Sequence, residues 1–170
     1  MTAMLRPQDV VVALHIALLE HQQPTYPELA AALGLSLSEV HGAVKRAMAA
    51  GLLRADRQPV RAAIVELVVH GVKYVFAPNR GQLTRGMPTA HGAPPLDKLV
   101  PSVDEPPPVW PDPEGKVRGE SFEPLYRSVP TAAKKNPKLY GALCLVDAIR
   151  GGRARDRALA EKLIKEMLGG

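Results

Sequence analysis

Residues 25–53, TYPELAAALGLSLSEVHGAVKRAMAAGLL, constrain the fold of this chain more than any other segment. Thr25 and Glu28 have the spacing of a capping box, in which each side chain accepts a hydrogen bond from the backbone amide of the other residue. A proline within the first turn suits the start of a helix. Gly34 supplies the left-handed residue that commonly ends one. The pattern therefore predicts a helix of about two turns that starts near Tyr26.

A second capping box begins only two residues after that glycine. Ser36 and Glu39 repeat the spacing of the first box, so a second helix must start almost where the first one ends. Leu35 is left to pack in the turn. Two helices that are joined this tightly have to cross steeply, as they do in a helix-turn-helix.

The second helix is predicted to be amphipathic. Its buried stripe follows a spacing of three and four residues and contains Leu37, Val40, Val44 and Ala47. Its outer face is small, polar and basic, and contains Ser38, His41, Gly42, Lys45 and Arg46. A helix in the DNA major groove needs short residues at its start, hydrogen-bonding groups for base edges and cations for phosphates. We therefore expect these five residues and Ser36 to contact DNA. A structural or protein-binding role for the helix is the alternative.

The stretch LAAALGLSLSEVHGAVKRAMAAGLL resembles the winged helix-turn-helix of MarR-like bacterial transcription regulators. Their pattern has an apolar helix, a Gly-Leu-Ser turn, a recognition helix with a Lys-Arg step and a Gly-Leu-Leu exit. The resemblance covers roughly the first half of the chain. It implies a regulator of transcription, expected to be a repressor, that binds double-stranded DNA as a homodimer. Winged helices also bind proteins, so the alternative is an antitoxin-like protein or complex scaffold with a protein partner encoded nearby.

Helices are also predicted on both sides of this segment. Residues 7–21 start with a proline and have an early Asp9, which complements the helix dipole. His15 in this helix is expected to be partly buried and hydrogen-bonded rather than a cofactor ligand. Residues 59–70 have apolar spacing that favours a helix ended by Gly71. Their many β-branched residues leave a strand as the alternative.

A β-hairpin is predicted over residues 72–85. The apolar residues of its first strand alternate with others, and residues 78–81 have strong turn chemistry. This hairpin would be the wing, with Arg80 at its tip and Arg85 on its return strand. Both arginines would then contact the sugar-phosphate backbone or the minor groove. The alternative is that both are solvated arginines without a ligand.

Residues 88–128 are predicted to be a proline-rich strap. Nine of the 17 prolines lie within residues 87–113, and proline fixes φ and removes an amide donor. Four apolar side chains indicate that the strap packs in places: Leu96, Leu99, Val100 and Trp110. Residues 109–119 also repeat the pattern of residues 75–86, namely Val, aromatic, proline turn, Gly, apolar and Arg-Gly. A second hairpin could therefore pair with the first, or the turn chemistry could have converged by chance.

Residues 129–170 are predicted to form a helical hairpin for dimerisation or partner binding. Asn136 and Pro137 are a helix start, and a Gly-Gly step ends that helix. Cys144 within it is expected to be a small buried filler. The turn between the helices carries Arg150, Arg153, Arg155 and Arg157. Positive charge at a helix N-terminus is unfavourable, so an anionic partner is expected. Neutralisation by acidic residues at helical spacing is the alternative.

Composition limits the function further. The 170 residues have a formal net charge of +5, which is compatible with a nucleic-acid partner. The single cysteine excludes an internal disulfide and a cysteine-rich zinc site, and the scattered histidines have no metal-ligand spacing. No nucleophile elbow, phosphate loop or paired-carboxylate motif is present, so we expect neither an enzyme nor a cofactor. The apolar run at residues 10–19 is too short to span a bilayer and no secretion signal is seen, so a cytoplasmic location is expected.

The predicted fold is mainly α with a small β component. A winged helix-turn-helix domain is expected over residues 1–87, the strap over 88–128 and the helical hairpin over 129–170.

Overall fold

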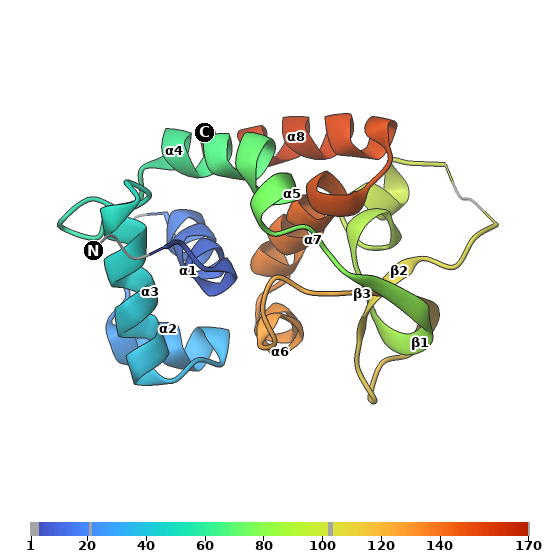
Figure 1. Ribbon diagram of the computed structural model, residues 1–170, viewed down its shortest axis with the longest axis horizontal. Coiled ribbons are helices and arrows are strands. Elements are labelled where there is room, and N and C mark those ends of the chain that lie inside the picture. The colour runs from blue at the N-terminus through green and yellow to red at the C-terminus, as the bar shows by residue number, and fades with distance from the viewer. Residues whose placement is uncertain (1–3, 21, 102–103, 170) are drawn as a thin grey trace.

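The computed structural model describes residues 4–20, 22–101 and 104–169, which are mainly helical with one small sheet (Figure 1). In chain order the elements are α1 (Pro7–Leu18), α2 (Tyr26–Leu33), α3 (Leu37–Ala49), α4 (Arg61–Glu66), the π-helix η1 (Leu67–Gly71), α5 (Val72–Val75), β1 (Arg80–Pro88), the 3-10 helices η2 (Ala90–Gly92) and η3 (Leu96–Lys98), β2 (Pro108–Pro111), β3 (Val117–Phe122), α6 (Val129–Lys135), α7 (Pro137–Gly151) and α8 (Ala154–Gly169). None of the described helices is long and apolar enough to cross a membrane.

Both predicted capping boxes are present. The Thr25 hydroxyl accepts a hydrogen bond from the amide of Glu28 at 3.2 Å, and the Glu28 carboxylate accepts one from the amide of Thr25 at 3.0 Å. Ser36 and Glu39 make the same two bonds at 3.1 and 2.7 Å. Gly34 ends α2 with a φ of 65°. The predicted starts of α2 and α3, and the tight turn between them, are confirmed.

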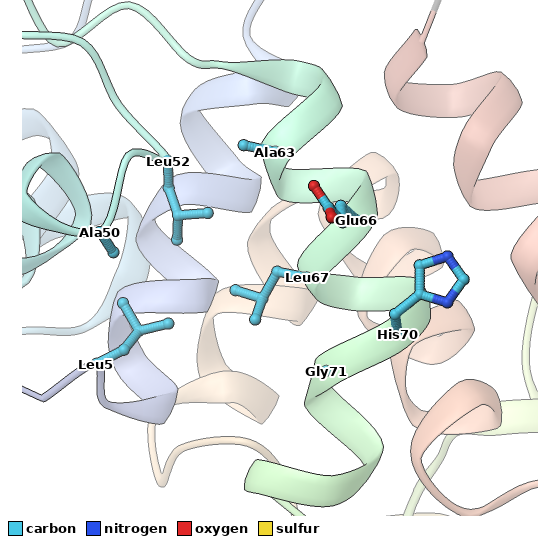
Figure 2. A pocket seen from close by; sticks show the side chains of 8 residues that line it. All are labelled: Leu5, Ala50, Leu52, Ala63, Glu66, Leu67, His70 and Gly71. Atoms are coloured by element: carbon cyan, nitrogen blue, oxygen red, sulfur yellow. The ribbon is translucent and has the colours of Figure 1, made fainter.

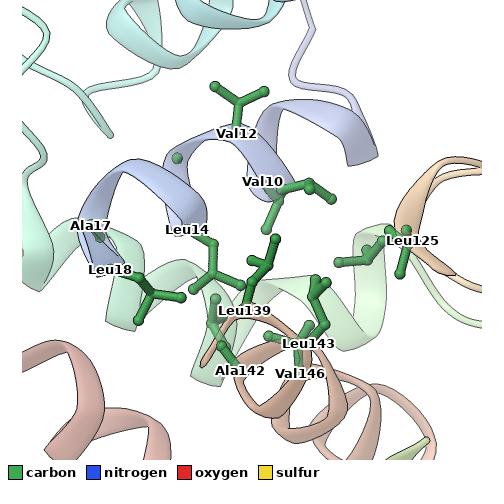
Figure 3. Close-up of a cluster of buried hydrophobic side chains, with 14 of the residues drawn as sticks. Val10, Val12, Leu14, Ala17, Leu18, Leu125, Leu139, Ala142, Leu143 and Val146 are labelled. Atoms are coloured by element: carbon green, nitrogen blue, oxygen red, sulfur yellow. The ribbon is translucent and has the colours of Figure 1, made fainter. Parts of the chain in front are cut away.

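Helices α1 and α7 lie at the centre of the molecule. Residues 9–18 of α1 and 141–150 of α7 are buried without exception. Figure 3 shows Val10 and Leu14 of α1 facing Leu139 and Leu143 of α7. Helices from the two ends of the sequence therefore meet in one core, to which α3, α4, α6 and α8 also contribute.

Three details of these helices bear on the predictions. Helix α1 ends at Leu18, three residues before the predicted end, and residue 21 lies outside the described residues. Cys144 is buried, as predicted. His15 is fully rather than partly buried, and its Nδ1 has no hydrogen-bond partner among the described residues. Burial lowers the pKa of His15, which favours the neutral ring.

Residues 61–75 are helical throughout, so the helix predicted at 59–70 is confirmed and the strand alternative is wrong. The predicted stop at Gly71 is also wrong, because the chain passes through it as a π-helix and continues to Val75. The buried residues Ile64, Val68 and Val72 recur every four positions, which keeps the segment helical despite its β-branched side chains. The hairpin predicted at 72–85 is therefore not formed.

The sheet is a small closed barrel of β1, β2 and β3. Strand β1 runs antiparallel to both of the others, and β2 runs parallel to β3. Pro108–Pro111 is a strand, which corrects the prediction of an irregular strap there; its prolines stand at the two ends, where fewer ladder donors are needed. The two repeated sequence patterns do pair in one sheet, as strands rather than as two hairpins, with Arg85 opposite Arg118.

Two glycines allow the barrel strands to approach closely. A Cβ atom at Gly86 would lie 2.1 Å from the carbonyl oxygen of Trp110, and one at Gly119 would lie 2.0 Å from that of Pro107. Any other residue would push these strands apart. The strap packs on the core through Leu96 and Trp110, as predicted, whereas Leu99 is exposed.

Candidate nucleic-acid interface

Helix α3 has one buried and one exposed face. Val40, Val44 and Ala47 are buried as predicted. Leu37 was predicted to join them but is 49% exposed, and Ala43 is buried in the stripe instead. The exposed face contains Ser36, Ser38, His41 and Lys45.

His41 belongs to a small cluster that joins three segments. Its ring centroid lies 4.0 Å from that of Tyr26 at the start of α2. The guanidinium carbon of Arg57 lies 4.9 Å from the centroid of the same tyrosine ring, and Arg57 Nη1 donates to the Pro24 carbonyl at 3.1 Å. No periodic signal marks Tyr26 or Arg57 as site residues, since their proximity to His41 depends on how α2, α3 and the segment after α3 pack together. The cluster holds the imidazole at the surface in a defined position.

A short hairpin follows α3 directly. Leu53 and Pro59 form an antiparallel bridge, and the Arg54 amide donates to the Gln58 carbonyl at 2.8 Å. Arg54 is exposed on this hairpin, and Arg57 adopts a φ of 67° in its turn. Residues 54–58 have no periodic pattern or motif that would mark them as part of a binding site. The hairpin nevertheless places Arg57 over the Tyr26 ring, which in turn contacts His41 on the exposed face of α3.

Arg46 does not belong to the exposed face, contrary to prediction. Its guanidinium donates from Nε and Nη2 to both carboxylate oxygens of Asp9, at 2.8 and 2.9 Å. Asp9 is completely buried and also accepts from the Arg6 amide at 2.8 Å. The hydrogen bond to Asp9 raises the pKa of Arg46. Arg46 therefore joins α3 to the start of α1 and is not available for a phosphate.

The absence of a side chain at Gly42 leaves space for the Arg46 guanidinium in this ion pair. A Cβ atom at Gly42 would lie 3.0 Å from Nη1 of Arg46, whose guanidinium is fixed by Asp9 and has little freedom to move. The predicted reason for a small residue here was close approach to DNA. Space for Arg46 is a second reason, which arises from packing within the chain.

The structure does not bring Arg80 and Arg85 to α3. Both lie on β1, at the opposite end of the molecule from α3 (Figure 1). Arg80 donates to Glu120 Oε1 at 3.3 Å and to the Gly151 carbonyl, and lies over the Phe122 ring. Arg85 is exposed opposite Arg118. The prediction that Arg80 and Arg85 lie on a wing beside α3 is therefore wrong.

The four arginines around the turn from α7 to α8 do not form one patch. Arg150 is buried, so it is not part of an exposed partner surface. Arg153 is exposed and paired with Glu105, Arg155 is exposed, and Arg157 donates from Nη2 to the Gly152 carbonyl at 3.2 Å. Internal neutralisation, the alternative at this turn, holds for Arg150, whose Nη1 lies 2.7 Å from Oδ1 of Asp147.

Asp147 is the centre of a buried polar network. One of its carboxylate oxygens accepts from the Thr89 hydroxyl at 2.6 Å and from Trp110 Nε1 at 2.7 Å, and the other accepts from Arg150. Burial raises the pKa of Asp147, while these donors and the Arg150 charge act in the opposite direction. Arg150 also donates to the carbonyls of Phe76 and Glu123, at 2.9 and 3.1 Å. The network therefore ties α7 to the barrel and to the end of α5, which is a structural role.

Glu39 connects the start of α3 to the segment before α6. Its Oε1 accepts from the Tyr126 hydroxyl at 2.5 Å and from Arg127 at 2.6 Å, in addition to the capping bond from Ser36. The hydrogen bond from Tyr126, together with those from Ser36 and Arg127, lowers the pKa of Glu39 from 4.5 to about 2. The ionised carboxylate therefore stabilises the position of α3.

This contact predicts a pH-dependent contribution to stability. Because the folded-state pKa of Glu39 is depressed, its stabilising effect is fully present above pH 4.5 and is lost as the pH falls through about 2. Urea unfolding of wild type and Glu39→Gln should thus differ at neutral pH and converge across that window. Glu166→Gln, at an exposed position on α8, is the matched control and should unfold at the same urea concentration as wild type at every pH. A constant difference between wild type and Glu39→Gln at all pH values would contradict the assignment.

Comparison of the chain with models of known protein families, with curated proteins and with solved structures finds no match.

Proposed function

We propose that the protein is a regulator of transcription that binds double-stranded DNA through α3. The observation that carries this proposal is the exposed face of α3. Among the residues that the structure describes, Ser38 and Lys45 on this face make no ion pair and no side-chain hydrogen bond. His41 beside them is held by aromatic contact alone. Groups of this kind, on a helix whose start is held by the Ser36–Glu39 capping box, are available for a ligand with base edges and phosphates.

In this proposal α2 and α3 form a helix-turn-helix and residues 53–59 form a short wing. Ser38 and His41 lie in the first turns of α3 and would face base edges, whereas Lys45 lies farther along and would meet a phosphate. The Ser36 hydroxyl accepts the capping bond, which leaves its own proton for a phosphate at the helix N-terminus. Arg54 and Arg57 would make the contacts to the DNA sugar-phosphate backbone that were predicted for Arg80 and Arg85.

The resemblance of α2, α3 and the following residues to MarR-like regulators also favours DNA binding. The proposed activity is repression. One helix and one short wing cover little DNA, so useful affinity requires two copies on a pseudo-palindromic site. A homodimer is therefore part of the proposal. The cytoplasmic location expected from the sequence is also part of it.

The test is the DNA affinity of Lys45→Ala, measured by fluorescence anisotropy on the promoter of the protein's own gene across a salt series. Losing one phosphate contact should weaken binding to all sequences and reduce the slope of log affinity against log salt by about one. Lys98→Ala, at an exposed position on η3 and away from α3, is the matched control and should behave as wild type.

Equal affinity and salt slope for wild type and Lys45→Ala would remove α3 from the DNA interface. Absence of any binding by the wild-type protein, on its promoter and on random duplexes alike, would favour a protein-interaction role. In that case the exposed face of α3 would be a surface for a protein partner.

A further inference from the structure

The helical segment of residues 61–75 has one face that is buried in the core and one that is half-buried or exposed. Its buried residues pack towards α7, α8 and α1. The other face carries two adjacent rows at a spacing of four residues, so each row follows the helix axis. One row contains Ala63, Leu67, Gly71 and Val75, and the other contains Glu66, His70 and Tyr74. All seven residues are half-buried or exposed.

The end of this face projects into solvent. Tyr74 is 77% exposed and Val75 is 63% exposed, which makes them two of the most exposed large apolar side chains of the described chain. The ammonium group of Lys73 lies 5.2 Å from the centroid of the Tyr74 ring. An aromatic ring in this position has a large apolar area without a partner, and adjacent exposed apolar groups of this kind mark an interaction surface.

A groove lies next to the same face, one to two turns earlier. Its volume is about 390 Å³, and Figure 2 shows Leu5 and Leu52 on one side of it and Ala63 and Leu67 on the other. Glu66 and His70 lie along its rim. The groove thus has an apolar floor and one acidic group at its edge, which suits an apolar side chain that is accompanied by a cation.

We propose that this face binds a second copy of the chain, with the two 61–75 helices antiparallel about a two-fold axis beside His70. Positions four residues to either side of the axis then face each other, so Tyr74 of one copy lies opposite Glu66 of the other. The Tyr74 ring enters the groove beside Leu67, and the neighbouring Lys73 meets the Glu66 carboxylate. Gly71 has no side chain to hold the two helices apart close to the axis.

Two properties of the face single out a second copy as the occupant. The projecting ring and the groove lie on one helix, so a two-fold contact fills both grooves and covers both rings at once, which closes the assembly at two copies. The charges are also complementary under the same axis, because Lys73 and Glu66 have opposite sign and meet twice. The proposal concerns assembly and does not depend on DNA binding.

The first test is sedimentation velocity over a micromolar concentration series. Wild type should dimerise, and Tyr74→Ala should raise the dissociation constant by about thirtyfold or more, as expected for a central aromatic anchor. Leu99→Ala is the matched control, since Leu99 is 55% exposed elsewhere on the chain, and it should leave the constant unchanged. Circular dichroism of each variant checks that the monomer is folded.

The second test exchanges the charges. Glu66→Lys and Lys73→Glu should each weaken the dimer, and the double variant should restore it, an outcome that a folding defect does not produce. A wild-type protein that is monomeric throughout, or a dimer that is insensitive to Tyr74→Ala and to both charge changes, would overturn the proposal. Lys45→Ala should leave the dimer intact, so failure of the interface and failure of DNA binding can be distinguished.

Discussion

Replacement of Asp147 by alanine should lower the free energy of unfolding by about 4 kcal/mol, the loss expected when one partner of a buried ion pair is removed. The side chains of Asp147 and Arg150 are each 2% exposed, so water does not replace the missing carboxylate. The Arg150 charge would remain buried, and Thr89 and Trp110 would each lose a hydrogen-bond acceptor. Equilibrium urea unfolding at neutral pH measures the effect.

Two further variants separate the charge from the hydrogen bonds. Thr89→Val removes one neutral donor and should lower the free energy of unfolding by about 2 kcal/mol, the range for a bond to a charged group. Asp147→Leu combined with Arg150→Met should be more stable than Asp147→Ala alone, because no unpaired charge remains. If Asp147→Ala were as stable as wild type, the carboxylate would not be the centre of this network.

The second large effect is expected for Arg46→Ala, which should lower the free energy of unfolding by about 3 kcal/mol. It leaves the completely buried Asp9 carboxylate with the Arg6 amide as its remaining donor. The Arg46 side chain is 14% exposed, so some water can reach the site, and the effect should be smaller than at Asp147. Thermal or urea unfolding of the variant checks this value.

Lys45→Ala is the matched control for Arg46→Ala, since it removes a cation one position earlier whose side chain points to solvent. It should leave stability unchanged. If Arg46→Ala were as stable as wild type and bound DNA less tightly, the assignment of Arg46 to the fold would fail. A DNA-binding assay on a double variant of Lys45 and Arg46 would confuse unfolding with the loss of a contact, so the two positions have to be tested separately.

Local signals explain which elements could be predicted from the sequence. Capping boxes and a left-handed glycine act within one turn, so the starts of α2 and α3 follow from Thr25, Gly34 and Ser36 alone. The Asn136 cap predicted the start of α7 in the same way, and its side chain accepts from the amides of Lys138 and Leu139.

Elements that depend on distant partners could not be predicted in this way. Gly71 is a reasonable helix end by local rules, but Val72 packs in the core and holds the chain helical beyond it. The barrel depends on contacts between Gly119 and Pro107 and between Gly86 and Trp110, which local patterns do not contain. The proline content predicted an irregular strap at residues 108–111, where the structure has strand β2.

In the candidate site too, positions decided by local periodicity could be predicted and positions decided by distant partners could not. Ser38, His41 and Lys45 could be placed on an outer helix face because helical periodicity decides which side they occupy. Arg46 shares that face by periodicity, yet the length of its side chain and the buried Asp9 draw it inward. Arg57 was missed because a polar turn has no periodic signal, and only the path of the chain after α3 brings it to Tyr26 and His41.

Selection of binding sites from random duplex DNA, with wild type and with His41→Ala, tests most directly whether α3 reads base edges. Wild type should enrich a pseudo-palindromic site. His41→Ala should enrich the same site with preference lost at one base pair in each half, by about fivefold or more, since one base contact contributes about 1–3 kcal/mol of discrimination. Identical selected sites for both proteins, or no enrichment by wild type, would contradict the assignment of α3 as the helix that reads DNA.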